Sequence, residues 1–258
     1  MPASANLIAL NTVVRREIVR VMRLWVEALV LPVITMALYF VIFGKLIGDR
    51  IGTFDGGFSY IQFITPGLVM MKIITISYDN ASGSIFFVRF NRSVEEMLLS
   101  PMSNWAILLG YVTGSVARGF LVGTVVLLIS LLFTSLHIAH PVTAFLSAFF
   151  SATIFSLVGF INGLYARTLD DIGRISVFAL NPLAFLGGGF YPVAMLNEPW
   201  QDMARLNPIM HMISAFRYGI LGAGEHDIGM AFAAMLILIV VLSIAALILL
   251  DRGVGTRS

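Results

Sequence analysis

Asn197 to Gly222 reads NEPWQDMARLNPIMHMISAFRYGILG, and here the chain departs from a plain series of apolar spans. Pro199 comes two residues after Asn197, and Pro208 directly follows Asn207. A proline in the first turn after an asparagine is typical of a helix start, so the stretch predicts two short helices. Neither has the roughly 20 apolar residues that a bilayer crossing requires, so we expect both to dip into one leaflet or lie on it.

The second of these helices has one apolar face, because its apolar side chains recur at helical spacing. A basic residue lies beside this face. The residues concerned are Ile209, Met212, Ile213, Phe216 and Arg217. An amphipathic connector that only floats at the membrane surface is the alternative interpretation.

The composition places the chain in a membrane. Of its 258 residues 59% are hydrophobic and only 12% are charged, with a mean hydropathy of +0.94. Soluble domains carry about a quarter charged residues. The sequence therefore predicts an all-α integral membrane protein with almost nothing left for a soluble domain. A formal net charge of +2 gives no reason to expect a nucleic-acid partner. The absence of cysteine excludes disulfides and thiolate chemistry.

One domain over residues 1–258 with six transmembrane helices fits the apolar pattern. Residues 6–23 come first as an amphipathic helix, whose arginine face opposite an apolar stripe is typical of a helix in the headgroup plane. The expected spans cover about residues 24–47, 58–78, 105–134, 142–166, 175–191 and 228–250. Pro32 predicts a kink in the first of them.

The orientation follows from the distribution of basic residues. Four lie on one side of the expected spans, namely Lys45, Arg50, Arg205 and Arg217. Ten arginines lie on the other side, namely Arg15, Arg16, Arg20, Arg23, Arg89, Arg92, Arg167, Arg174, Arg252 and Arg257. This bias predicts that both termini are cytoplasmic and that the two short helices lie on the outer side.

Enzyme motifs are missing. The sequence contains no G-x-x-x-x-G-K-[ST], no H-E-x-x-H and no G-x-S-x-G element. The pair His137 and His140 lacks a third ligand, so we expect no metal site. The chain is predicted to have no catalytic residues and to bind no cofactor.

Charged residues inside the expected spans are candidates for a polar path. Lys72 and Arg118 are the two basic ones, and Glu27 and Asp79 lie near the cytoplasmic ends of spans one and two. Lys72 is seven residues from Asp79, hence on the same helix face, and Glu27 is a second possible partner. In the alternative interpretation both carboxylates are interfacial and Lys72 extends towards them. Arg118 is expected to face a partner helix or a polar cavity.

Small residues four apart also mark the third and fourth spans. Gly110 and Gly114, and likewise Gly159 and Gly163, allow helices to approach closely in lipid. They indicate a tightly packed bundle or an interface between two chains.

The loop after span two predicts a short cytoplasmic helix. Ser93 and Glu96 form a capping box, and Met97 to Leu99 supply an apolar side. That side needs a partner, which is either the membrane surface or a soluble protein.

Three segments resemble the permease subunits of ABC-2 type exporters. They are FNRSVEEMLLSPMSN, GYVTGSVARGF and NPIMHMISAFRYGILG, and the likeness extends over nearly the whole chain. The resemblance implies the bacterial inner membrane, an N-terminal interface helix, six spans, a cytoplasmic coupling helix and two short outer helices. It also implies a second permease chain, as a homodimer, and two copies of a separate ATPase that binds ATP and magnesium. The ATPase contact would comprise Arg89, Arg92, Ser93, Glu95, Glu96, Met97 and Leu98, bordered by Arg16 and Arg20. The helix of residues 209–220 would help to close the outer end of the path. Substrates handled in the wider family are lipids, glycolipids or polysaccharide, and hydrophobic drugs.

Two other classes of protein remain open from the residues. An ion-coupled secondary transporter needs an acidic carrier within the membrane, and Glu27 and Asp79 lie near one surface instead. A membrane scaffold without transport has little reason to keep prolines, glycine repeats and an arginine in its spans.

Overall fold

The computed structural model describes residues 3–23, 26–48, 57–90, 103–223 and 228–254, and its described elements are all helices. This confirms the all-α class. Those labelled η1 to η3 are π-helical and η4 is a 3₁₀ turn. In chain order they are α1 (Ala3–Arg23), η1 (Val26–Val30), α2 (Leu31–Tyr39), η2 (Phe40–Ile47), α4 (Tyr60–Phe90), α6 (Asn104–Ser130), α7 (Pro141–Tyr165), α8 (Leu169–Ile175), η3 (Ser176–Leu180), α9 (Asn181–Leu186), η4 (Val193–Met195), α10 (Glu198–Leu206), α11 (Pro208–Leu221) and α12 (Ile228–Asp251).

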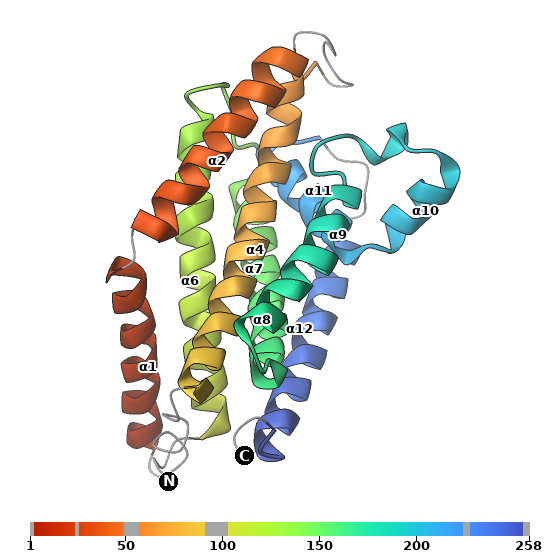
Figure 1. The fold of residues 1–258 in the computed structure, drawn as a ribbon. Helices are drawn as coiled ribbons and strands as arrows, with labels where there is room; N and C mark the ends of the chain where they lie inside the picture. Colours follow the sequence, from red (N-terminus) through yellow and green to blue (C-terminus); the bar gives the residue numbers. More distant parts are fainter. Residues whose placement is uncertain (1–2, 24–25, 49–56, 91–102, 224–227, 255–258) are drawn as a thin grey trace.

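Four of the described helices are long and apolar enough to cross a membrane, namely α4, α6, α7 and α12. Helix α4 occupies the middle of the bundle and packs on α6 and on α7. Helix α12 packs on the outside of α7, and α1 runs alongside the first half of α6 (Figure 1). The N-terminal end of α1 and the C-terminal end of α12 lie at the same end of the bundle, which we call the lower end (Figure 1).

The close packing of α4 against α7 depends on glycine. A β-carbon at Gly159 would collide with the backbone of Tyr78, and one at Gly163 would meet the carbonyl oxygen of Ser82. Glycine therefore lets the two helix backbones approach closely. These two glycines therefore serve packing within one chain. The sequence alone did not decide between this role and an interface between two chains.

The first and fifth apolar stretches have irregular hydrogen bonding. The first is one continuous helical run, from Val26 to Ile47, that changes from π to α turns at Leu31. In the fifth, the π-helical turn η3 is followed by α9. A proline lies in the first turn after each change, Pro32 in α2 and Pro182 in α9. Because proline has no backbone N–H, it interrupts the regular α-helical bonding at these points.

Helix α4 continues beyond the expected end of the second span near Tyr78. It runs on to Phe90 and has 31 residues, a length of about 46 Å at 1.5 Å per residue. The hydrocarbon core of a bilayer is about 30 Å thick, so the last turns of α4 extend beyond it. The first part of the expected polar loop is therefore helical, and its remainder, residues 91–102, lies outside the described residues.

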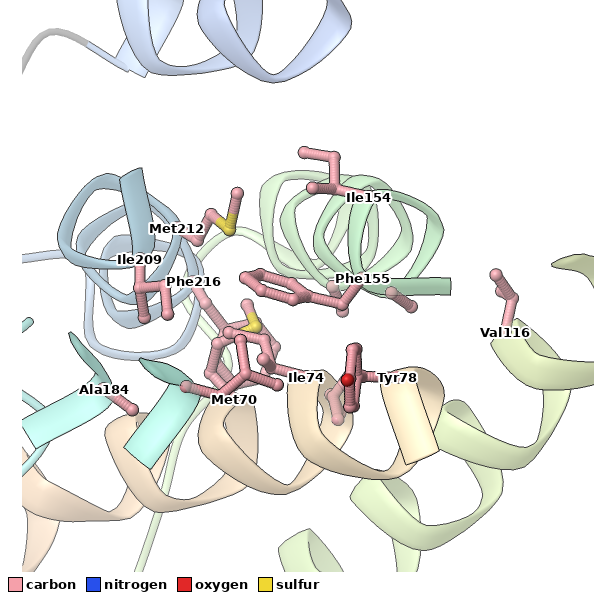
Figure 2. Close-up of a cluster of buried hydrophobic side chains, with 14 of the residues drawn as sticks. Met70, Ile74, Tyr78, Val116, Ile154, Phe155, Ala184, Ile209, Met212 and Phe216 are labelled. Carbon is pink, nitrogen blue, oxygen red and sulfur yellow. The ribbon is translucent and has the colours of Figure 1, made fainter. Parts of the chain in front are cut away.

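Helices α10 and α11 lie in the Asn197–Gly222 stretch. The Asn207 side chain caps α11 by accepting a hydrogen bond from the Ile209 backbone N–H (3.0 Å), and its Nδ2 donates to the Leu183 carbonyl (2.6 Å). Helix α11 ends at Gly222, which has a left-handed φ of +71°. Its apolar face packs on α4 and α7, where Phe216 and Met212 lie near Phe155 (Figure 2).

Candidate functional site

The inward face of α1 is seated on small residues of α6. Val13 and Glu17 are buried there, at 6% and 1% exposure. A β-carbon at Gly110 would collide with Val13, and one at Gly114 would collide with Glu17. Helix α1 therefore packs on the first glycine pair of α6, Gly110 and Gly114.

Glu17 is a carboxylate held between α1 and α4. Its Oε2 lies 2.8 Å from the Arg20 Nη2, and the Ser84 hydroxyl donates to it at 3.0 Å. Arg20 also donates to Ser84 and to Asn80 Oδ1, the latter at 2.9 Å. Since a buried charge is tolerated when it is paired and hydrogen-bonded, these contacts explain how Glu17 stays inside the bundle.

Asn80 extends this network to a third helix. Its Oδ1 accepts from Arg20 of α1 and from Arg118 of α6, the latter at 2.8 Å. Its Nδ2 donates to the Ser115 hydroxyl of α6 at 2.9 Å. One buried amide thus connects α1, α4 and α6. We call the connected set the polar joint, which comprises Glu17, Arg20, Asn80, Ser84, Ser115 and Arg118.

Arg16 adds a further link from α1 to α6, because its guanidinium donates to the Tyr111 hydroxyl and lies 5.6 Å from the Tyr111 ring centroid. Arg16 and Arg20 were expected at the border of an ATPase contact. The structure directs both guanidinium groups to the bundle. The placement of α1 in the headgroup plane stays a prediction.

The charged residues inside the expected spans lie around the polar joint. Asp79 lies near the charges of Arg118 and Lys72 and near the Ser176 hydroxyl of η3. Lys72 is half-buried and has Asp79 as its acidic neighbour. The side chain of Glu27 lies outside the described residues.

At the lower end, α4 also caps α7. Arg89 donates to the carbonyl oxygens of Gly163 and Ala166, at 2.8 and 3.0 Å. These carbonyls lie at the C-terminus of α7, where a helix lacks backbone donors and favours positive charge. Next in the chain, Asp171 accepts from the backbone N–H groups of Arg167 and Thr168, which lowers the pKa of its carboxyl.

Arg89 therefore has a structural contact of its own. Its part in an ATPase contact stays a prediction. The other residues assigned to the coupling helix lie outside the described residues, namely Arg92, Ser93, Glu95, Glu96, Met97 and Leu98.

At the opposite end, Arg217 of α11 binds backbone and an aromatic ring. It donates to the carbonyl oxygens of Gly188 (2.6 Å) and Phe63 (3.3 Å), and its guanidinium carbon lies 3.9 Å from the Phe63 ring centroid. Arg217 thus ties the turn after α9 to α4 and α11. The expected outer-gate residues Ile209, Met212, Ile213 and Phe216 are buried in α11. Their part in an outer gate, and that of Arg217, stays a prediction.

Among the described residues no group of three His, Asp or Glu side chains could hold a metal ion. His140 instead stacks on Tyr218, with ring centroids 4.7 Å apart.

Sequence reasoning did not find Glu17, Asn80 or Ser84. Two signals were present. Glu17 is an acidic residue three positions before Arg20 within an arginine-rich helix, a spacing that suits an ion pair. Asn80 and Ser84 are four residues apart, but they lay beyond the expected end of the span and so were read as loop.

The fold and the buried polar joint define a helical integral membrane protein. The family model for the ABC-2 type transporter matches residues 8–221. The chain therefore belongs to the ABC-2 type transporter family.

Several known proteins are similar to this chain over most of its length. The inner membrane transport permease YadH of Escherichia coli K12 is 46% identical over 251 residues, which cover 97% of this chain and 98% of the relative. Nodulation protein J of Rhizobium meliloti is 26% identical over 198 residues, covering 74% of this chain and 73% of that protein. Nodulation protein J of Neorhizobium galegae is 25% identical, covering 81% and 80%.

Proposed function

We propose that this chain is the transmembrane permease subunit of an exporter driven by a separate ATPase. Two permease copies pair with two ATPase copies, and ATP and magnesium bind only in the ATPase. Each permease has six spans, with the Val26–Ile47 run in the first and about residues 175–191 as the fifth. Both termini are cytoplasmic, so the lower end faces the ATPase and α10 and α11 lie in the outer leaflet.

The observation that carries the proposal is the polar joint. An ATPase that moves the cytoplasmic end of α1 displaces Glu17 and Arg20. Arg20 donates to Asn80 of α4, and Glu17 accepts from Ser84 of the same helix. Through Asn80 the displacement reaches Arg118 of α6. When the ATPase closes on ATP, the spans therefore rearrange with it. ATP then favours one arrangement of the spans over the other, and this difference in affinity drives alternating access.

The transported substrate is a lipid, a glycolipid or polysaccharide, or a hydrophobic drug, and it moves outward. This part of the proposal rests on family membership. Screening candidates by their stimulation of ATPase activity in nanodiscs addresses it.

The test of the main proposal is gentle purification from native membranes. We expect a stoichiometric ATPase to accompany the permease and to hydrolyse ATP. Reversing Glu95 and Glu96 to lysine should abolish this association or uncouple hydrolysis from transport. As a matched control, Asp202→Lys reverses an exposed charge in α10, at the opposite end, and should change neither. Absence of any ATPase in several detergents and in nanodiscs would refute the proposal.

An ion-coupled transporter is the second candidate, because Asp79 lies near both Lys72 and Arg118. Replacing Asp79 by Asn and Glu27 by Gln separates the two candidates. Transport that persists in this double variant rules out a carboxylate carrier at these positions.

A further inference from the structure

A basic groove lies between α1 and the lower part of α4. Its volume is about 560 Å³. Of the described residues, four arginines and one glutamate line it, and their formal charges sum to +3. The arginines are Arg15, Arg16, Arg20 and Arg23.

The four arginines differ in what they bind. Arg20 and Arg16 are directed to the bundle through Glu17, Asn80 and the Tyr111 hydroxyl. Arg15 and Arg23 are exposed, and among the described residues they form no ion pair. Within the described part of the chain, the groove therefore keeps two arginines that form no ion pair with a carboxylate.

The other lining of the groove is apolar. Val19 of α1 and Phe87 of α4 are 49% and 47% exposed there, and Val88 lies beside them. A groove with guanidinium groups and exposed apolar side chains suits a ligand that has an anionic head and a hydrocarbon part. Arginine in particular matches phosphate oxygens in geometry.

The depth of the groove fits the membrane surface. Ser84 and Phe87, which line it, are 24 and 27 residues beyond Tyr60 on α4. At 1.5 Å per residue they lie about 36–40 Å along the helix. With Tyr60 taken as the outer boundary of the hydrocarbon, this is past the ~30 Å core and within the headgroup region.

We propose that this groove binds the phosphate headgroup of an anionic phospholipid, with Arg15 and Arg23 as the charged contacts and Val19 and Phe87 against the start of the acyl chains. The leaflet, taken as cytoplasmic, rests on the orientation in the proposed function. Basic clusters beside spans attract anionic lipid with about 1 kcal/mol per residue. A bound lipid would hold α1 against α4 beside the polar joint.

The test uses the full chain in detergent and native mass spectrometry, with phosphatidylglycerol and phosphatidylcholine titrated separately. Wild-type protein should prefer phosphatidylglycerol, and raising the ionic strength should weaken that preference. Replacing both Arg15 and Arg23 by Gln should weaken phosphatidylglycerol binding about 30-fold and leave phosphatidylcholine unchanged. Replacing both by Lys should keep most of the preference.

The matched control is Arg167→Gln with Arg252→Gln, two exposed arginines at the same end but outside the groove. It should bind phosphatidylglycerol like wild type. Equal phosphatidylglycerol binding by the Arg15 and Arg23 glutamine variant and wild type would overturn the proposal, as would a wild-type preference that ignores salt.

A third outcome would also overturn it. If the glutamine variant keeps its lipid but loses a co-purifying ATPase, the groove belongs to the protein partner. Lipid binding is measured on the isolated chain and needs no ATPase, so its failure is distinguishable from a failure of the proposed exporter function.

Discussion

Replacing Glu17 by glutamine should release α1 from the bundle. Glutamine keeps the shape of the side chain and an acceptor for Ser84, but it removes the negative charge that Arg20 contacts at 2.8 Å. The substitution thus isolates the electrostatic part of the contact between α1 and the spans.

The expected magnitude follows from the burial of the two partners. Removing one partner of a fully buried ion pair costs about 3–5 kcal/mol, mainly because the other charge is stranded. Arg20 is 30% exposed and retains its bond to Asn80, so its charge is not stranded. We therefore expect only the loss of a charge-assisted hydrogen bond, about 2 kcal/mol. A loss of that size raises the open population of α1 about 30-fold.

The natural absence of cysteine makes this measurable without background labelling. A single Val13→Cys reporter is buried against Gly110 and should react with a maleimide only when α1 opens. Its labelling rate in membranes should rise about 30-fold when Glu17→Gln is added, since the rate follows the open population. An Asn11→Cys reporter is exposed and lies outside the basic groove, so it should label quickly in both backgrounds.

Equal labelling of Val13→Cys in the wild-type and Glu17→Gln backgrounds would refute the reasoning, because α1 would then be held by packing on the glycines alone. Asp202→Asn is the matched control. It removes an exposed ion pair with Arg205, at 3.3 Å, which is worth about 0–1 kcal/mol and lies at the other end of the bundle.

Three further predictions concern other parts of the fold. Gly159→Val should abolish monodisperse protein in size-exclusion chromatography, because any β-carbon there collides with α4, whereas Gly173→Ala meets nothing within 4 Å and should be tolerated. Arg118→Leu removes a donor to Asn80 and should lower transport in nanodiscs at least tenfold, and Arg118→Lys should have an intermediate effect. If Arg118→Leu transports like wild type, the role of Arg118 is limited to packing. Asp171 has a lowered pKa, so its stabilisation of the start of α8 is complete above its unfolded pKa of about 3.9 and is lost as pH falls through the lower folded value. Hydrogen exchange at the α8 amides should show this pH dependence in wild type and not in Asp171→Asn.

The sequence predicted the helical class and the family because both depend on local signals. Apolar runs of 20 or more residues require helices in lipid, and Asn207 with Pro208 marks a helix start within the chain itself. The resemblance that pointed to the family lay in contiguous segments, and the match over residues 8–221 agrees with it.

The polar joint could not be predicted in the same way, because its members come from three helices far apart in the sequence. Arg20 and Asn80 are separated by 60 positions, and Asn80 and Arg118 by 38. An amphipathic pattern indicates that α1 has two faces, but it does not say which face meets protein. From charge alone, the arginines on α1 were predicted to face the lipid headgroups or an ATPase. In the structure, Glu17 neutralises one of them inside the bundle.

The chemistry of Asn80 explains why an amide stands at the centre of this joint. Its oxygen accepts from two arginines and its nitrogen donates to Ser115, so one neutral side chain satisfies groups of both kinds. A leucine there would offer neither, and it would leave Arg20 and Arg118 without their common acceptor. Because the two guanidinium groups share one oxygen, a displacement of Arg20 changes the hydrogen bond available to Arg118. Movement of α1 is thereby transmitted to α6 through Asn80, without any direct contact between the two arginines.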